Sequence, residues 1–120
     1  MHFNKSVNYA IRGIVHTFHT ERNFRIECFV GLLVFILSFI LHMREYEKII
    51  LAMMIAFVLV LELLNTTIEI FLDLLKPRLS PHVELVKDIM AGAVLFASMG
   101  SIIVGIIIFV PYIVELWFLK

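Results

Sequence analysis

Polar residues interrupt a long apolar run in the middle of this chain. From Ile49 the sequence reads IILAMMIAFVLVL and continues as ELLNTTIEIFLD. At about 100° of helical rotation per residue, the polar side chains of the second stretch fall within about 80° of one another. This stripe, on one face of a helix, consists of Glu62, Asn65, Glu69 and Asp73. Because a central Asp costs about 2.5–3.5 kcal/mol in lipid, the stripe must face protein, water or a polar ligand.

The spacing of these acids fits phosphoryl transfer at a membrane surface. Glu69 and Asp73 lie about 10 and 16 Å further along the helix axis than Glu62, toward its expected surface end. Surface carboxylates suit Mg²⁺, which binds a few carboxylates together with substrate phosphates. A lysine such as Lys87 could neutralise a transferring phosphoryl group, and Glu62 could accept a proton from a lipid hydroxyl. The chain has no G-x-x-x-x-G-K-[ST] loop, so a nucleotide would be held without a P-loop.

Other charged residues are predicted at the same membrane face. They stand at the entrances of two further apolar segments and are Glu21, Arg22, Arg25, Glu27, Lys87 and Asp88. Taken singly, each group is more typical of interfacial anchors or of a solvated charge run. Their coincidence with the acidic stripe is what favours a functional site.

Composition places the whole chain in a membrane. Of its 120 residues 62% are hydrophobic and 17% charged, whereas soluble domains have about 25% charged residues. The net charge is +0, so no basic surface indicates nucleic-acid binding, and the single Cys28 excludes an internal disulfide or a cysteine metal site.

Helices long enough to cross about 30 Å of hydrocarbon must position the polar groups. The chain reads as one all-α domain over 1–120, with a surface helix at about 3–20 and spans at about 26–43, 49–75 and 89–114. Pro77 favours an end of the second span near Leu75 or Lys76, and Ser80 with Pro81 suits a helix start.

The N-terminal segment predicts an amphipathic helix. Apolar residues recur every three or four positions at Phe3, Val7, Ile11, Ile14 and Phe18. This helix rests in the membrane surface or docks on the rest of the protein, and the two interpretations are compatible. We interpret His16 and His19, three residues apart, as surface histidines rather than a metal site.

Basic residues predict the orientation. Seven would lie on the side of the N-terminus and the 76–88 loop, against three on the other side, which places the first side in the cytoplasm. Three spans form a thin bundle that encloses polar groups poorly, so we expect self-association. Small residues every four positions in the third span would allow close helix approach or packing within one chain: Ala93, Ala97, Ser101 and Gly105.

Two motifs resemble those of a known family. ELLNTTIEIFLD resembles the E-x-x-N-[ST]-x-[IL]-E-x-x-x-D signature of the bacterial integral-membrane diacylglycerol kinase and undecaprenol kinase family, and KDIMAGAVL (87–95) resembles its second signature. NYAIRG (8–13) and ERNFRIE (21–27) extend the resemblance over nearly the whole chain. It implies a homotrimeric, three-span lipid kinase of the bacterial cytoplasmic membrane that uses MgATP and builds active sites between subunits.

The resemblance also implies roles for individual residues. Glu62 corresponds to the catalytic base, and Glu21 and Glu69 to the carboxylates that hold the metal and the ATP phosphates. The remaining matches are Asn65 in the active site, Tyr9 at the nucleotide, Lys87 and Asp88 near the phosphates, and Arg25, Glu27 and Asp73 at supporting polar positions.

Some positions depart from the family pattern. Arg78, Leu79 and Ser80 replace an acidic-Tyr-His run near the nucleotide, and His2 replaces an arginine, which leaves nucleotide preference open. ERNFRIE, AGAVL and IIFVP resemble undecaprenol kinases more than diacylglycerol kinases, so undecaprenol is the favoured substrate. Two alternatives from other classes are a small oligomeric transporter that uses Glu62 as a proton or cation site, and a structural membrane subunit.

Overall fold

The computed structural model describes residues 3–75 and 80–118, and within these ranges the chain is built from helices. In chain order they are α1 (Phe3–Thr20), α2 (Arg22–Ile40), α3 (Glu45–Asp73) and α4 (Ser80–Phe118). The last three are each long and apolar enough to cross a membrane. The predicted class, an all-α membrane protein with an N-terminal helix and three spans, is therefore confirmed.

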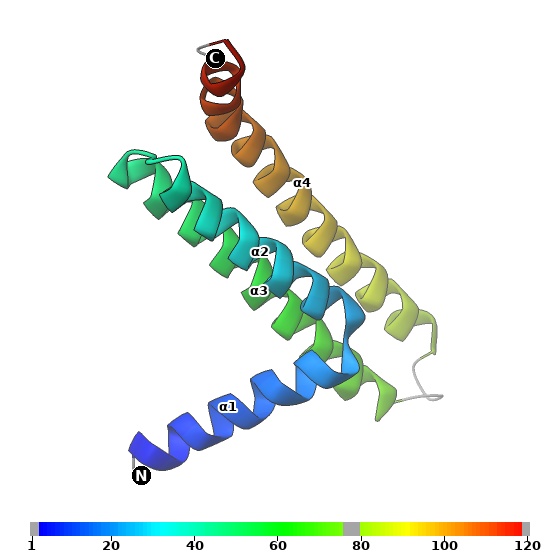
Figure 1. Ribbon diagram of the computed structural model, residues 1–120. Helices are drawn as coiled ribbons and strands as arrows, with labels where there is room; N and C mark the ends of the chain where they lie inside the picture. The colour runs from blue at the N-terminus through cyan, green and yellow to red at the C-terminus, as the bar shows by residue number, and fades with distance from the viewer. Residues whose placement is uncertain (1–2, 76–79, 119–120) are drawn as a thin grey trace.

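The three long helices run side by side, and α1 leaves them at a steep angle (Figure 1). Helix α3 packs against both α2 and α4. The α1–α2 junction, the end of α3 and the start of α4 lie at one end of the bundle, which we call the inner end, and the α2–α3 turn lies at the other, outer end. The fold thus brings the charged residues at the α1–α2 junction, the end of α3 and the start of α4 to the inner end, as the three-span topology predicts.

Helix boundaries differ from the predicted spans by a few residues. Helix α2 begins at Arg22, before the predicted span of 26–43, because the charged residues ahead of the apolar segment form its first turn. It ends at Ile40 rather than Met43. The reason for the early end is His42, whose φ of 54° is a left-handed conformation that terminates a helix. Helix α3 ends at Asp73, slightly before the predicted end.

Helix α4 begins at the predicted start, Ser80. Several sequence inferences fall outside the described residues. These are the ones that involve His2, Lys76, Pro77, Arg78 and Leu79.

Close helix packing holds α2 against α3. Gly31 of α2 is buried, and a Cβ atom at this position would lie 2.7 Å from Cγ2 of Ile55 on α3. Real Cβ atoms essentially never come so close, so a larger residue would require either the Ile55 side chain or the helices to shift. Few apolar side chains are buried in the single chain, while large ones such as Phe57 and Ile102 are exposed, as expected for a surface that faces lipid or another subunit.

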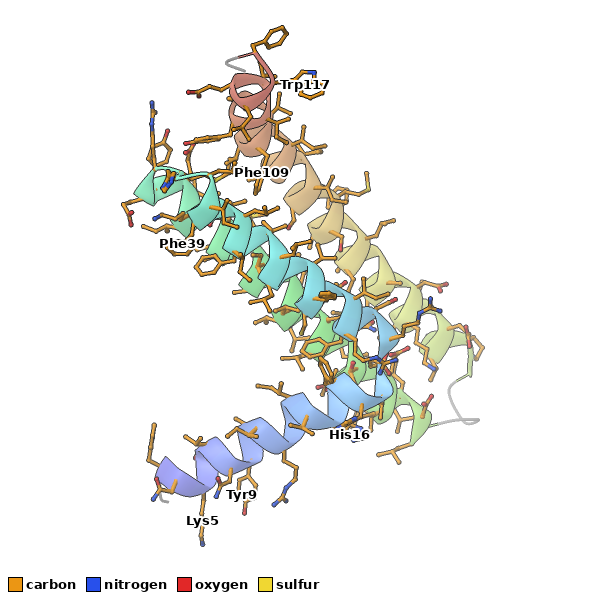
Figure 2. The ribbon with its side chains drawn as sticks, viewed as in Figure 1. Lys5, Tyr9, His16, Phe39, Phe109 and Trp117 are labelled. Carbon is orange, nitrogen blue, oxygen red and sulfur yellow. The ribbon has the colours of Figure 1, made fainter. Side chains whose placement is uncertain are left out.

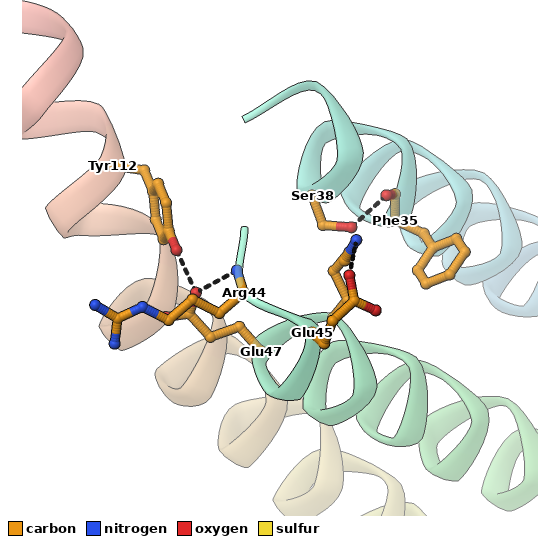
Figure 3. Close-up of polar contacts among 7 residues, drawn as sticks. Phe35, Ser38, Arg44, Glu45, Glu47 and Tyr112 are labelled. Atoms are coloured by element: carbon orange, nitrogen blue, oxygen red, sulfur yellow. Dashed lines mark hydrogen bonds and ion pairs between the residues drawn. The ribbon is translucent and has the colours of Figure 1, made fainter. Parts of the chain in front are cut away.

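Polar contacts tie the helices together at the outer end (Figure 3). The Tyr112 hydroxyl of α4 donates a hydrogen bond to Glu47 of α3, whose carboxylate also accepts the Arg44 backbone N–H at 3.1 Å. Lys48 forms an ion pair with Glu45 at 2.8 Å. Because Tyr112 follows Pro111, which interrupts the helical hydrogen bonding of α4, its hydroxyl fixes the segment beyond the proline to α3.

Among the described residues, those of helix α1 that contact the bundle lie only near its C-terminal end (Figure 1). Thr17 is its buried residue, whereas the predicted apolar face from Phe3 to Phe18 is exposed. An exposed apolar face on a helix beside three membrane spans fits the membrane-surface interpretation. Docking on the same chain is confined to the last turns of α1.

Candidate active site

The predicted polar stripe forms on α3, and its deepest member is buried. Glu62 is 3% exposed, and its Oε2 atom has no hydrogen-bond partner in the described structure. The Asn65 amide donates to Oε1 of Glu69 at 3.2 Å, and the Thr66 hydroxyl donates to the Glu62 carbonyl at 3.1 Å. Both bonds join residues four apart, so the helix itself aligns the stripe.

Carboxylates from two helices converge around Glu62. The charges of Glu21, at the α1–α2 junction, and of Glu69 both act on Glu62, and the charge of Glu62 acts on Glu27 of α2. The four acids, which were predicted from two segments of the sequence, therefore interact electrostatically. Protonation or a bound cation would relieve their mutual repulsion.

A polar pocket of about 250 Å³ lies beside this cluster at the inner end. Glu21 and Glu69 both line it, and Asp73 extends its wall by one turn of α3. The remaining lining residues are His16, Thr20, Thr66 and Ile70. The pocket thus offers carboxylates, hydroxyls and an imidazole, which are groups that contact a hydrated cation or phosphates.

An apolar groove of about 490 Å³ lies deeper in the bundle between α2, α3 and α4. Its walls include Val58 and Leu59 of α3, one turn before Glu62, and Gly105 of α4. Glu27 lines the groove, and its Oε1 atom is buried without a partner in the described structure. Glu62 stands between this groove and the polar pocket, since Thr66, one turn later, lines the pocket.

The predicted lysine lies at the edge of the pocket. Nζ of Lys87 is 3.0 Å from Oδ1 of Asp73, which joins the start of α4 to the end of α3. Asp88 follows on α4 and is exposed. The structure therefore brings Glu21, Glu69, Asp73 and Lys87 to one place.

Two predicted site residues have other contacts in the single chain. The Arg25 guanidinium donates to the carbonyls of Phe18 at 2.8 Å and His19 at 3.1 Å, so it caps the C-terminal end of α1. Tyr9 lies out on α1, two turns before His16, with the Arg12 guanidinium 5.6 Å from its ring (Figure 2). The structure does not bring Tyr9 to the pocket of its own chain.

Comparison with known proteins identifies the family. A family model described as prokaryotic diacylglycerol kinase matches residues 8–109. The chain belongs to this family. The prokaryotic diacylglycerol kinases are lipid kinases by name, and the predicted resemblance is confirmed.

Individual relatives in the family carry two different names. The chain is 38% identical over 113 residues to a diacylglycerol kinase from Synechocystis sp., covering 92% of this chain and 64% of that relative's length. It is also 38% identical over 109 residues to an undecaprenol kinase from Bacillus subtilis, covering 91% of this chain and 89% of the relative. No solved structure matches the chain.

The side chains that line the polar pocket fit a hard cation whose remaining ligands are supplied by the substrate and by water. Among the described residues no group of three His, Cys, Asp or Glu side chains stands ready to hold a metal. Mg²⁺ does not need such a cage, because it uses one or two carboxylates and takes its other ligands from waters and phosphates. Glu21 and Glu69 are two carboxylates of this kind on one pocket.

Sequence reasoning missed three polar residues that line the pocket. His16 and Thr20 are four residues apart and share a face of α1, and Thr66 lies four residues after Glu62. This spacing was the available signal, because residues four apart are neighbours on a helix. His19, by contrast, does not line the pocket.

Proposed function

We propose that this chain catalyses ATP-dependent phosphorylation of a membrane lipid alcohol, either undecaprenol or diacylglycerol. The observation that carries the proposal is the position of Glu62, a buried acid between a polar pocket and an apolar groove. A lipid kinase must take a phosphate donor from water and a hydroxyl from the membrane. Glu62 lies where these two substrates would meet.

In this proposal the polar pocket holds the phosphates of ATP. Glu21 and Glu69 would hold Mg²⁺, which neutralises phosphate charge when it is bound. Lys87 and Asp88 would lie near the phosphates, and Asn65 keeps Glu69 in place through its hydrogen bond. Tyr9 would contact the nucleotide from a neighbouring subunit or after a movement of α1.

The chemical step needs one base. Glu62 accepts the proton of the lipid's primary hydroxyl while the hydroxyl oxygen attacks the γ-phosphorus of ATP. The new P–O bond forms as the bond to the β-phosphate oxygen breaks, so the products are a lipid phosphate and ADP. Burial of Glu62 excludes water from the attacking position, which limits hydrolysis of ATP.

Assembly and orientation are part of the proposal. We infer self-association, because one chain leaves an apolar groove open and buries few apolar side chains, and the family resemblance implies that the assembly is a homotrimer. The small residues Ala97, Ser101 and Gly105 on α4 would allow close approach. The excess of basic residues near the inner end supports a cytoplasmic position for that end, and hence for the polar pocket.

Undecaprenol is the favoured substrate. Support comes from the motifs ERNFRIE, AGAVL and IIFVP, and from the relative named undecaprenol kinase, 89% of whose length is aligned with this chain. Both lipids present a primary hydroxyl at the level of the headgroups, so the base would act identically on either.

Phosphate transfer from labelled ATP tests the proposal. Purified protein is incubated with Mg²⁺ in mixed micelles that contain either undecaprenol or diacylglycerol. We expect label in a lipid, with undecaprenol as the better acceptor. No label in either lipid, from protein shown to be folded, would reject the kinase proposal; ATP-independent, proton-coupled flux in proteoliposomes would then favour a transporter.

A further inference from the structure

The contact between Asp73 and Lys87 connects the proposed nucleotide pocket to α4. Asp73 is the last residue of α3 and lines the polar pocket, while Lys87 lies in the second turn of α4. The 3.0 Å ion pair between them joins the two helices at the inner end. Other groups at the pocket, namely Glu21 and Glu69, are acidic.

We propose that Asp73 is a positioning residue that holds the Lys87 ammonium at the rim of the pocket, ready to contact the phosphates of the nucleotide. The inference rests on the proposed function and assigns Asp73 a specific task in it. Asp73 acts through Lys87 and needs no contact with substrate.

Side-chain entropy gives the physical reason for such a device. A free lysine populates many rotamers, and fixing it in one of them has an entropic cost. In this chain Asp73 already restricts the lysine before a nucleotide arrives. Part of the ordering cost is then met in folding rather than in binding.

Because the ion pair is exposed, the Lys87 ammonium can exchange Asp73 for another anionic partner. The side chain of Asp73 is 60% exposed and that of Lys87 is 24% exposed. Exposed ion pairs contribute only about 0–1 kcal/mol, so a nucleotide phosphate, with more negative charge, can share or take over the ammonium. A deeply buried pair would hold the lysine too tightly for this exchange.

The positioning role and simple electrostatics predict opposite effects on nucleotide binding when the Asp73 carboxylate is removed. This difference makes the proposal testable. Asp73→Asn deletes a negative charge from a pocket that is to bind a polyanion, and on charge alone it should strengthen nucleotide binding. If Asp73 positions Lys87, the same substitution should weaken binding by about two- to fivefold, which corresponds to the contribution of an exposed pair. Asp73→Glu keeps a carboxylate and should restore binding.

The experiment measures MgATP binding to the full-length protein in detergent micelles by calorimetry, without lipid acceptor. Asp73→Asn, Lys87→Gln and the double variant form a thermodynamic cycle. We expect each single variant to bind more weakly and Asp73→Asn to cause no further weakening in the Lys87→Gln background. Glu45→Gln, which breaks the 2.8 Å pair with Lys48 at the outer end, is the matched control and should bind as the unaltered protein does.

The outcomes separate the alternatives. Tighter or unchanged binding by Asp73→Asn, or equal weakening in both backgrounds, overturns the positioning role and leaves the kinase proposal intact. A lower melting temperature for Asp73→Asn with unchanged MgATP affinity would assign Asp73 a structural role and also overturn it. Failure of the unaltered, folded protein to bind MgATP would instead reject the proposed function itself.

Discussion

Replacing Glu62 with glutamine should abolish activity and at the same time stabilise the protein. The substitution keeps the size of the side chain but removes its ability to accept a proton. It also removes a charge from a site that is 3% exposed, where Oε2 has no partner in the described structure and the charges of Glu21 and Glu69 act on it.

The two effects have separate magnitudes. A general base contributes about 10²–10⁴-fold to rate, so kcat should fall at least about 100-fold, which equals about 3 kcal/mol of transition-state stabilisation. A buried, unpartnered neutral group costs about 1–3 kcal/mol and a charged one more. Glutamine should therefore raise the free energy of unfolding by about 1 kcal/mol. MgATP affinity should change little, because Glu62 does not line the polar pocket.

Three measurements on one preparation check this reasoning. Label transfer into lipid gives kcat, calorimetry gives MgATP affinity, and thermal unfolding in micelles gives stability. Glu84→Gln, at an exposed carboxylate of α4, is the control for loss of a charge and should leave all three nearly unchanged. More than about a tenth of the original turnover in Glu62→Gln would refute the assignment of the base. A clear loss of stability would mean that the Glu62 carboxylate is satisfied by a contact absent from the single chain.

Other substitutions test the packing and the pocket. Gly31→Ala should destabilise the protein by about 1–3 kcal/mol in unfolding assays, because its Cβ would lie 2.7 Å from Cγ2 of Ile55. Adding Ile55→Leu, which removes Cγ2, should recover much of the lost stability. Gly100→Ala is the control and should not destabilise the protein, because the space around Gly100 is open. Equal stabilities of the two alanine variants would contradict the close approach of α2 and α3. Tyr112→Phe should lower the melting temperature with little effect on MgATP affinity, since its hydrogen bond lies at the outer end; weaker binding would show that the two ends are coupled. Glu69→Gln should weaken MgATP binding several-fold in calorimetry, and unchanged affinity would exclude Glu69 as a phosphate or metal ligand.

The sequence predicted the elements and the acidic stripe well for a physical reason. Charged side chains are costly to expose to lipid. The residue types in a stripe such as Glu62 to Asp73 are therefore enough to indicate that this side of the helix does not face lipid. Helical spacing then determines which residues share that side, and the contact from Asn65 to Glu69 follows from it.

Contacts between separate segments were harder to predict. The role of Arg25 as a cap of α1 depends on the sharp change of direction at Glu21, whose φ and ψ of −113° and 111° interrupt the helix. Periodicity does not determine such an angle. Helical spacing puts His16 and Thr20 on one face of α1, but whether that face lines the pocket depends on how α1 meets α3.

The depth of Glu62 imposes a constraint on the substrates themselves. Seven residues separate Glu62 from Glu69, which is about 10 Å along the axis, so in the proposed reaction a phosphoryl group held at Glu69 would have to extend toward the membrane to meet a hydroxyl at Glu62. Water is a poor competitor there because the site is almost inaccessible to it. In the proposed reaction an alcohol with an apolar chain would approach through the groove, whose walls end one turn before Glu62 on α3. A base at the wall of the pocket would be closer to ATP but would also activate water, so under this proposal the deeper position of Glu62 would favour transfer to lipid over hydrolysis.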